Sequence, residues 1–245
     1  MVPEKKIEEF VSGLRQAVGS NLQGVVLYGS SVADDLHPGS DINLLCLFRE
    51  LSFSTFEQLT SVIAPWNRQN LPTPLLMTTE ELQCVSDVFV IELIDIQAHH
   101  RVLYGNADII SRLVIPTDFH RAQVEYELRE KLILLRQRML MATNNKEQLW
   151  ELMVRSVSSF ITLIRHALML MNHEIPAAKS KMLELAALQL SFDASALLEI
   201  LNVREQKINR SKLDAKDAAA RYLFAIGQVT AAVDKMLDSP GPHNL

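Results

Sequence analysis

A glycine followed by two serines could bind phosphate in the first part of the chain. Gly29, Ser30 and Ser31 follow the apolar run GVVLY, within the stretch YGSSVADDLHPGSDINLL. A glycine lets the backbone approach a phosphate closely, and the N–H groups of a turn that opens a helix face the anion together with the helix dipole. The two hydroxyls add further donors. The sequence therefore predicts a phosphate site at these three residues.

Asp41 is the candidate metal ligand of the same stretch. It stands twelve residues after Gly29 and opens a second apolar run, DINLLCLF. Carboxylate oxygens are ligands that Mg²⁺ prefers. Residues two apart on a strand point to the same face, so Asn43 should lie beside Asp41. An amide oxygen can coordinate a cation but adds no negative charge, so this pair is poorer in charge than two carboxylates.

Short apolar runs rich in β-formers supply the strands that would position these residues. GVVLYG is bounded by glycines, which is typical of a buried strand, and helical spacing predicts helices around it. Pro74 restricts its own run to a strand start or a sheet edge. The expected strands are 24–29, 41–48, 73–78 and 100–105, and the expected helices are 4–18, 54–68 and one capped by Thr78 or Thr79, whereas 89–97 fits either type.

The pattern becomes helical throughout after a boundary near residue 115. Pro116 is followed by Thr117 and Asp118, which are candidate helix caps. Beyond them apolar residues recur every three or four positions, as in amphipathic helices. We therefore expect an α+β protein with two domains: a mixed β-sheet with flanking helices at residues 1–115, and an all-α bundle of four or more helices at residues 116–245.

Composition excludes several classes of protein. The 245 residues are 48% hydrophobic and carry a net charge of −5, so no global basic field attracts nucleic acid. The first residues are charged, and no stretch approaches the roughly 18 apolar residues that span a bilayer. We expect a cytoplasmic protein without a membrane or nucleic-acid partner. The two cysteines, Cys46 and Cys84, are too few for a disulfide scaffold and are both expected to be buried and reduced.

The stretch LYGSSVADDLHPGSDINLL resembles the signature of the DNA polymerase β-like nucleotidyltransferase superfamily. That signature is a hydrophobic residue, Gly-Ser, a spacer and then Asp-x-Asp on a strand. The order of elements extends the likeness over residues 1 to about 110. The helical half resembles, more loosely, the bundle of small bacterial members and aminoglycoside-modifying relatives, where it shapes the acceptor side of the cleft and often the dimer interface. The resemblance implies Mg²⁺ and a nucleoside triphosphate as cofactors of an active protein, and a homodimer through the helical domain.

By the same resemblance, active members use three carboxylates: the two of Asp-x-Asp and one on a neighbouring strand. The first falls on Asp41, which would be the catalytic and metal-binding residue, and the second falls on Asn43. The strand TPLLMT, where the third is expected, contains no acidic residue. Asp95 is the candidate substitute if residues 89–97 form the strand that borders the cleft. Otherwise Asp95 and its neighbour Glu92 belong to the solvated face of a half-buried element, which is the favoured interpretation.

Two functions remain, and the loss of charge favours the first. In the first, the protein is a catalytically impaired nucleotidyltransferase-fold protein, a pseudoenzyme that binds a nucleotide or a protein partner. In the second, it is an active Mg²⁺-dependent enzyme that moves an NMP from an NTP to a small hydroxylated acceptor or a protein. A fold can outlast its chemistry, so the resemblance alone does not decide between them.

Two motifs in the helical half keep two interpretations each. LREKLILLRQR at residues 128–138 could border a cleft that holds an anionic acceptor, or it could be a charged outer face. Arg165 and His166 could bind a nucleotide, but adjacent residues on a helix do not share a face, which favours a structural role.

Overall fold

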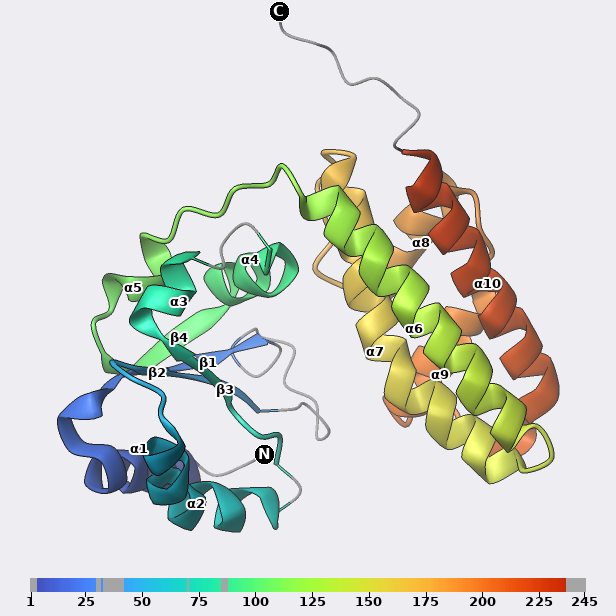
Figure 1. The fold of residues 1–245 in the computed structure, drawn as a ribbon. Coiled ribbons are helices and arrows are strands. Elements are labelled where there is room, and N and C mark those ends of the chain that lie inside the picture. Colours follow the sequence, from blue (N-terminus) through green and yellow to red (C-terminus); the bar gives the residue numbers. More distant parts are fainter. Residues whose placement is uncertain (1–3, 30–31, 33–41, 70, 85–87, 237–245) are drawn as a thin grey trace, which may run out of the picture. The chain divides into compact units, whose positions relative to one another are not determined.

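A computed structural model describes residues 4–29, 32, 42–69, 71–84 and 88–236 (Figure 1). The chain divides into two compact units, Met1–Asp118 and Phe119–Leu245, and each is described by itself. Three residues of the predicted site, Ser30, Ser31 and Asp41, lie outside the described residues.

The N-terminal unit is built on a four-stranded mixed sheet with the strand order β3-β2-β1-β4. The central strand β1 (Leu22–Tyr28) runs antiparallel to β2 (Asn43–Phe48) and to β4 (His100–Gly105). The edge strand β3 (Leu75–Thr78) is parallel to β2. The four strands overlap the four runs that the sequence predicts, although β1 begins two residues before its predicted start, and Pro74 directly precedes the edge strand.

Helices cover both faces of this sheet, which explains why its strands are continuous apolar runs rather than alternating ones. One face of the sheet packs against α1 (Glu4–Val18) and α2 (Phe53–Asn67), and the other packs against α3 (Thr79–Cys84), α4 (Val90–Ala98) and α5 (Asp108–Ser111) (Figure 1). Successive residues of β1 alternate between these two cores: Val25 and Leu27 in the first, Val26 in the second.

Side-chain caps fix where two of these helices begin. The Thr78 hydroxyl accepts a hydrogen bond from the Glu81 N–H at 3.0 Å, and the Glu81 carboxylate accepts one from the Thr78 N–H at 2.7 Å, which is a capping box for α3. Ser52 and Thr55 form the same motif at α2. Thr78 is therefore the cap of α3, as one of the two predicted candidates.

The C-terminal unit is a bundle, as predicted. Its core is lined by side chains from every long helix, and two of the helices begin at side-chain caps, Asn145 and Asp214. The predicted caps Thr117 and Asp118 are wrong, because α6 begins after Phe119, which has no polar side chain to cap it. The helices are α6 (His120–Ala142), α7 (Lys146–Leu170), α8 (Lys179–Leu190), α9 (Ser195–Arg204) and α10 (Ala215–Lys235).

The helix α7 is apolar over much of its length. Among the described residues it alone is long and apolar enough to cross a membrane, but 50% of its most apolar window is buried inside the structure. Such burial is typical of the core helix of a bundle.

Candidate active site

Three residues from neighbouring strands form a row at one end of the sheet. Tyr28, the last residue of β1, pairs with Asn43 at the start of β2 and with His100 at the start of β4. Each of these three residues lies two positions along its strand from a residue of the hydrophobic core that packs under α3, α4 and α5. Side chains two apart on a strand point to the same face, so all three side chains point to the face that these helices cover. The row therefore lies where the predicted phosphate stretch begins and where the predicted metal strand starts.

Gly29 follows this row in a conformation that favours glycine. Its φ is +81°, in the left-handed region that side chains with a Cβ rarely adopt. Its N–H donates to the His99 carbonyl at 3.0 Å, and its carbonyl accepts from the Val32 N–H at 3.0 Å. Because its N–H is used inside the protein, Gly29 would serve a phosphate through its shape and the absence of a Cβ. The donors would come from Ser30 and Ser31, whose role stays a prediction.

Asn43 lies directly against Gly29. A Cβ built on Gly29 would be 3.2 Å from Asn43 Nδ2, which is closer than an ordinary van der Waals contact. Asn43 is half-buried. The position at which the sequence resemblance expects the second carboxylate is thus occupied by an amide that packs on the predicted phosphate-binding turn.

The neighbouring strand β3 adds no acid at this end of the sheet. Its register pairs Leu75 with Leu45 in parallel, so two residues earlier Thr73 is level with Asn43. Thr73 is exposed, and Leu75 packs against the apolar core on this side of the sheet. The structure therefore brings no carboxylate from β3 to the row.

The helix α4 brings two carboxylates to the same side of the sheet. The sequence makes Asp95 a substitute ligand on condition that its segment is a strand, and that condition is wrong. Val90, Leu93 and Ile96 are buried at helical spacing, so the segment forms a helix. Asp95 is half-buried, and its role as a ligand stays a prediction.

Glu92, one turn before Asp95, is the acid whose charge reaches the row. Burial raises the pKa of Tyr28, and the nearby charge of Glu92 raises that pKa further. The sequence names Asp95, and not Glu92, as the conditional substitute ligand and favours a solvated face for both acids, because the packing of the helix on the sheet cannot be read from the chain. The only signal is that two acids three residues apart share one side of a helix.

A complete metal site is not formed by the described part of the chain. No group of three or more His, Cys, Asp and Glu side chains within it could hold a metal ion. Asp41, the predicted ligand, lies outside it, so its place beside Asn43 rests on the sequence alone.

Other polar groups singled out in the sequence have structural surroundings. Cys46 is fully buried in β2, and burial raises its pKa to about 12. Cys84 is exposed at the end of α3, so the expectation that both cysteines are buried is wrong for Cys84. His166 is fully buried, and its Nδ1 lies 2.8 Å from Nε2 of the buried His120. This contact joins α6 to α7 inside the bundle, in keeping with a structural role for His166.

Comparison with known proteins identifies the N-terminal unit. Residues 5–99 match the model of the nucleotidyltransferase domain. This unit is a nucleotidyltransferase domain. It belongs to the DNA polymerase β-like superfamily, as the Gly-Ser and Asp-x-Asn stretch indicates.

Solved structures of nucleotidyltransferases are similar to the chain. The spectinomycin adenyltransferase of Enterococcus faecialis, whose structure contains ATP and spectinomycin, shares the fold with a TM-score of 0.61 and 18% identity over 94% of this chain and 99% of that one. The chain also matches a nucleotidyltransferase-like protein of Exiguobacterium sibiricum, with a TM-score of 0.35 and 14% identity over 94% of this chain and 76% of that one. No curated protein sequence matches significantly.

The nucleotidyltransferase domain thus forms a glycine turn at the end of β1, where the sequence predicts a phosphate site. Its Gly29 turn is formed, and Tyr28, Asn43 and His100 lie in register at its base. What distinguishes it from the pattern of active members is chemical: an amide in place of the second carboxylate, and no acid on β3.

Proposed function

We propose that the nucleotidyltransferase domain binds a nucleotide at the Gly29 turn but is impaired in nucleotidyl transfer, so that the chain acts as a nucleotide-binding or interaction module. The observation that carries this proposal is Asn43, whose amide packs against Gly29 and which the sequence resemblance assigns to the position of the second carboxylate.

The magnitude of the loss supports impairment. Bound Mg²⁺ would neutralise phosphate charge and stabilise the transferring group, and it prefers hard, charged oxygens. Asp41 would be the one carboxylate that remains from the family pattern. Single preorganised electrostatic contacts of this kind are worth about 3–4 kcal/mol, or a factor of roughly 10²–10³ in rate. The loss of two such acids therefore predicts a large rate defect.

A nucleotide is the ligand class to test first. The similar adenyltransferase was solved with ATP, although that likeness shows the fold alone. A turn with a positive-φ glycine and following hydroxyls suits a phosphate chain. The base and the sugar stay undefined, so all four ribonucleoside triphosphates are tested.

An active, Mg²⁺-dependent nucleotidyltransferase is the second candidate function. One observation favours it: α4 places Glu92 close enough to Tyr28 to raise the pKa of the phenol. Glu92 or Asp95 would then replace a missing carboxylate beside Asp41, and an NMP would pass from an NTP to a hydroxylated small molecule or a protein. Glu92→Gln separates the two functions, because it should abolish transfer in an active enzyme and leave nucleotide affinity unchanged in an impaired one.

Calorimetry with ATP, GTP, CTP and UTP tests nucleotide binding at the Gly29 turn. We expect saturable binding of at least one nucleotide by the wild-type protein. Ser30→Glu, which places a negative charge where the phosphates would lie, should abolish it by like-charge repulsion. Ser12→Glu, an equal change on the exposed side of α1, is the matched control and should bind normally. No binding of any nucleotide, or equal binding by both variants, would overturn the proposed site.

The expected homodimer is proposed to form through α6. Three large apolar side chains recur every seven residues on its outer face and are more than half exposed: Tyr126, Ile133 and Leu140. Such spacing is typical of a helix that packs on another helix. A second copy of the chain would cover this stripe, and light scattering should then give a dimer for the wild type and a monomer for Ile133→Glu. A wild-type monomer at micromolar concentration contradicts the dimer.

A further inference from the structure

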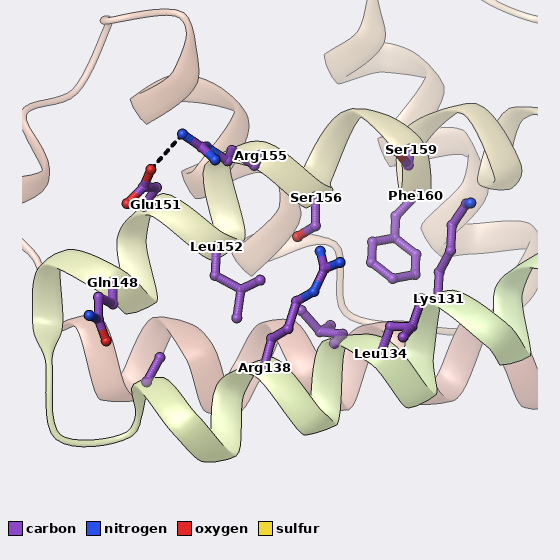
Figure 2. A pocket seen from close by; sticks show the side chains of 12 residues that line it. Lys131, Leu134, Arg138, Gln148, Glu151, Leu152, Arg155, Ser156, Ser159 and Phe160 are labelled. Carbon is purple, nitrogen blue, oxygen red and sulfur yellow. Dashed lines mark ion pairs between the residues drawn. The ribbon is translucent and has the colours of Figure 1, made fainter.

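The helical unit contains a groove lined only by its own residues. It runs between α6 and α7 and has a volume of about 530 Å³ (Figure 2). This volume is within the range of about 300–1,000 Å³ that small-molecule sites occupy. The groove is therefore large enough for a small organic ligand.

The floor of the groove is apolar. Leu135 of α6 and Phe160 of α7 are both buried, with 2% and 1% of their surfaces exposed, and Leu152 of α7 is half-buried. The hydroxyl of Ser156 also lines the groove, but it already donates to the Met153 carbonyl and contacts the Tyr222 hydroxyl at 3.0 Å. The floor thus offers hydrocarbon to a ligand body, and the exposed Ser159 also lines the groove.

The charges around the groove leave one cation uncompensated. Arg155 pairs with Glu151 at 2.6 Å, and Lys131 pairs with Glu127 at 2.7 Å. Arg138 takes part in no ion pair between residues that the structure describes. Figure 2 shows its guanidinium extending from α6 towards Ser156 on α7, over the apolar floor. An apolar groove with one available guanidinium suits a ligand with one negative end and an apolar body.

We propose that this groove binds a small organic anion, with an aromatic or branched body and one carboxylate or phosphate group. Arg138 would hold the anionic group, because a guanidinium presents a planar pair of N–H donors that matches both oxyanions. The side chains of Leu134 and Leu152 would contact the body, above the buried Leu135 and Phe160. This site is independent of the nucleotidyltransferase domain, so it stands or falls separately from nucleotide binding.

NMR titrations of the full chain test whether the ligand must be charged. The ligands are benzoate, phenyl phosphate and the neutral isostere benzamide. We expect saturable binding of at least one anion at millimolar concentration, and at least tenfold weaker binding of benzamide. The first two ligands distinguish a carboxylate site from a phosphate site. Equal affinity for benzamide, or no saturable binding of either anion, would overturn the proposal.

Paired arginine variants test the assigned residue. Arg138→Gln should weaken anion binding about ten- to hundredfold, which is the usual effect of a lost hydrogen bond to a charged group. Arg136→Gln, two residues away on the same helix and outside the groove, is the matched control and should change affinity less than about twofold. If both variants weaken anion binding equally, the general positive charge of α6 attracts the anion. That result would contradict a specific site at Arg138.

Both arginines are exposed, so each variant should fold, and matching circular dichroism melts verify this. Leu152→Asn tests the floor by a different route. It should weaken benzoate binding without removing the preference for benzoate over benzamide. An unchanged affinity in this variant would place the anion outside the groove.

Discussion

Replacing Gly29 by alanine tests the packing of Asn43 on the predicted phosphate turn. The methyl group would enter a backbone with φ of +81° and lie 3.2 Å from Asn43 Nδ2. The left-handed backbone costs a residue with a Cβ about 1–2 kcal/mol, and a crowded contact adds about 1–3 kcal/mol. Alanine recovers about 0.4–1 kcal/mol by restricting the unfolded chain. Gly29→Ala should therefore lower the free energy of unfolding by about 2–3 kcal/mol.

Gly19→Ala is the control that separates backbone strain from the contact. Gly19 also has a positive φ, +53°, but a Cβ there would meet nothing within 4 Å. Its replacement should cost only the backbone part, about 1 kcal/mol. The difference between the two variants measures the contact with Asn43. Asn43→Ala, combined with Gly29→Ala, should return about 1 kcal/mol or more of the lost stability.

Fluorescence of one tryptophan reports the unfolding of the N-terminal unit alone. The chain has two tryptophans, and Trp150→Phe leaves Trp66, which is 3% exposed and donates its ring N–H to the Pro72 carbonyl at 2.8 Å. Urea unfolding in this background gives the free energies of the single and double variants. If Gly29→Ala costs no more than Gly19→Ala, or if Asn43→Ala restores nothing, Asn43 does not pack against the turn.

Three further predictions concern the two units separately. In the folded chain a thiol reagent should modify Cys84 alone, since Cys46 is buried, and modification of both would contradict the packing of β2. Burial favours the protonated Cys46 thiol, so the free energy of unfolding of the N-terminal unit should be full below pH 9.0. It should fall by up to about 1.4 kcal/mol per pH unit as pH rises towards 12, because only the unfolded chain then loses the thiol proton. Urea unfolding at several pH values should show a smaller slope for Cys46→Ala. Asn145→Ala should cost the helical unit about 1 kcal/mol, measured by Trp150 fluorescence, because the cap of α7 is lost; an equal loss in the neighbouring Asn144→Ala would remove that explanation.

The fold was predictable because its main signals are local. A short apolar run that ends at Gly29 marks β1, and the spacing of apolar residues marks the long helices of the second unit. The segment that forms α4 was ambiguous because nine residues are too few to show a clear period, and its buried residues are mostly β-branched or leucine. Only packing against the sheet decided its type.

The order of the candidate site residues can be read from the sequence, whereas their contacts cannot. Spacing from Gly29 is enough to place Asn43 at the second carboxylate position. The hydrogen bond from Gly29 to His99, and the approach of Glu92 to Tyr28, join residues far apart in the chain. Such contacts depend on how α4 lies on the sheet, which no local pattern encodes.

The dependence of ATP affinity on Mg²⁺ shows whether Asn43 prevents metal binding at this site. Calorimetry of the wild type, Asn43→Asp and Asp41→Ala gives the ratio of Kd without and with Mg²⁺ for each. We predict a ratio near one for the wild type, because Asn43 leaves too little charge for the metal, and a rise of about tenfold in Asn43→Asp, in which a second carboxylate is restored. A wild-type ratio that is already large and falls to one in Asp41→Ala would show a working metal site and refute an impaired one.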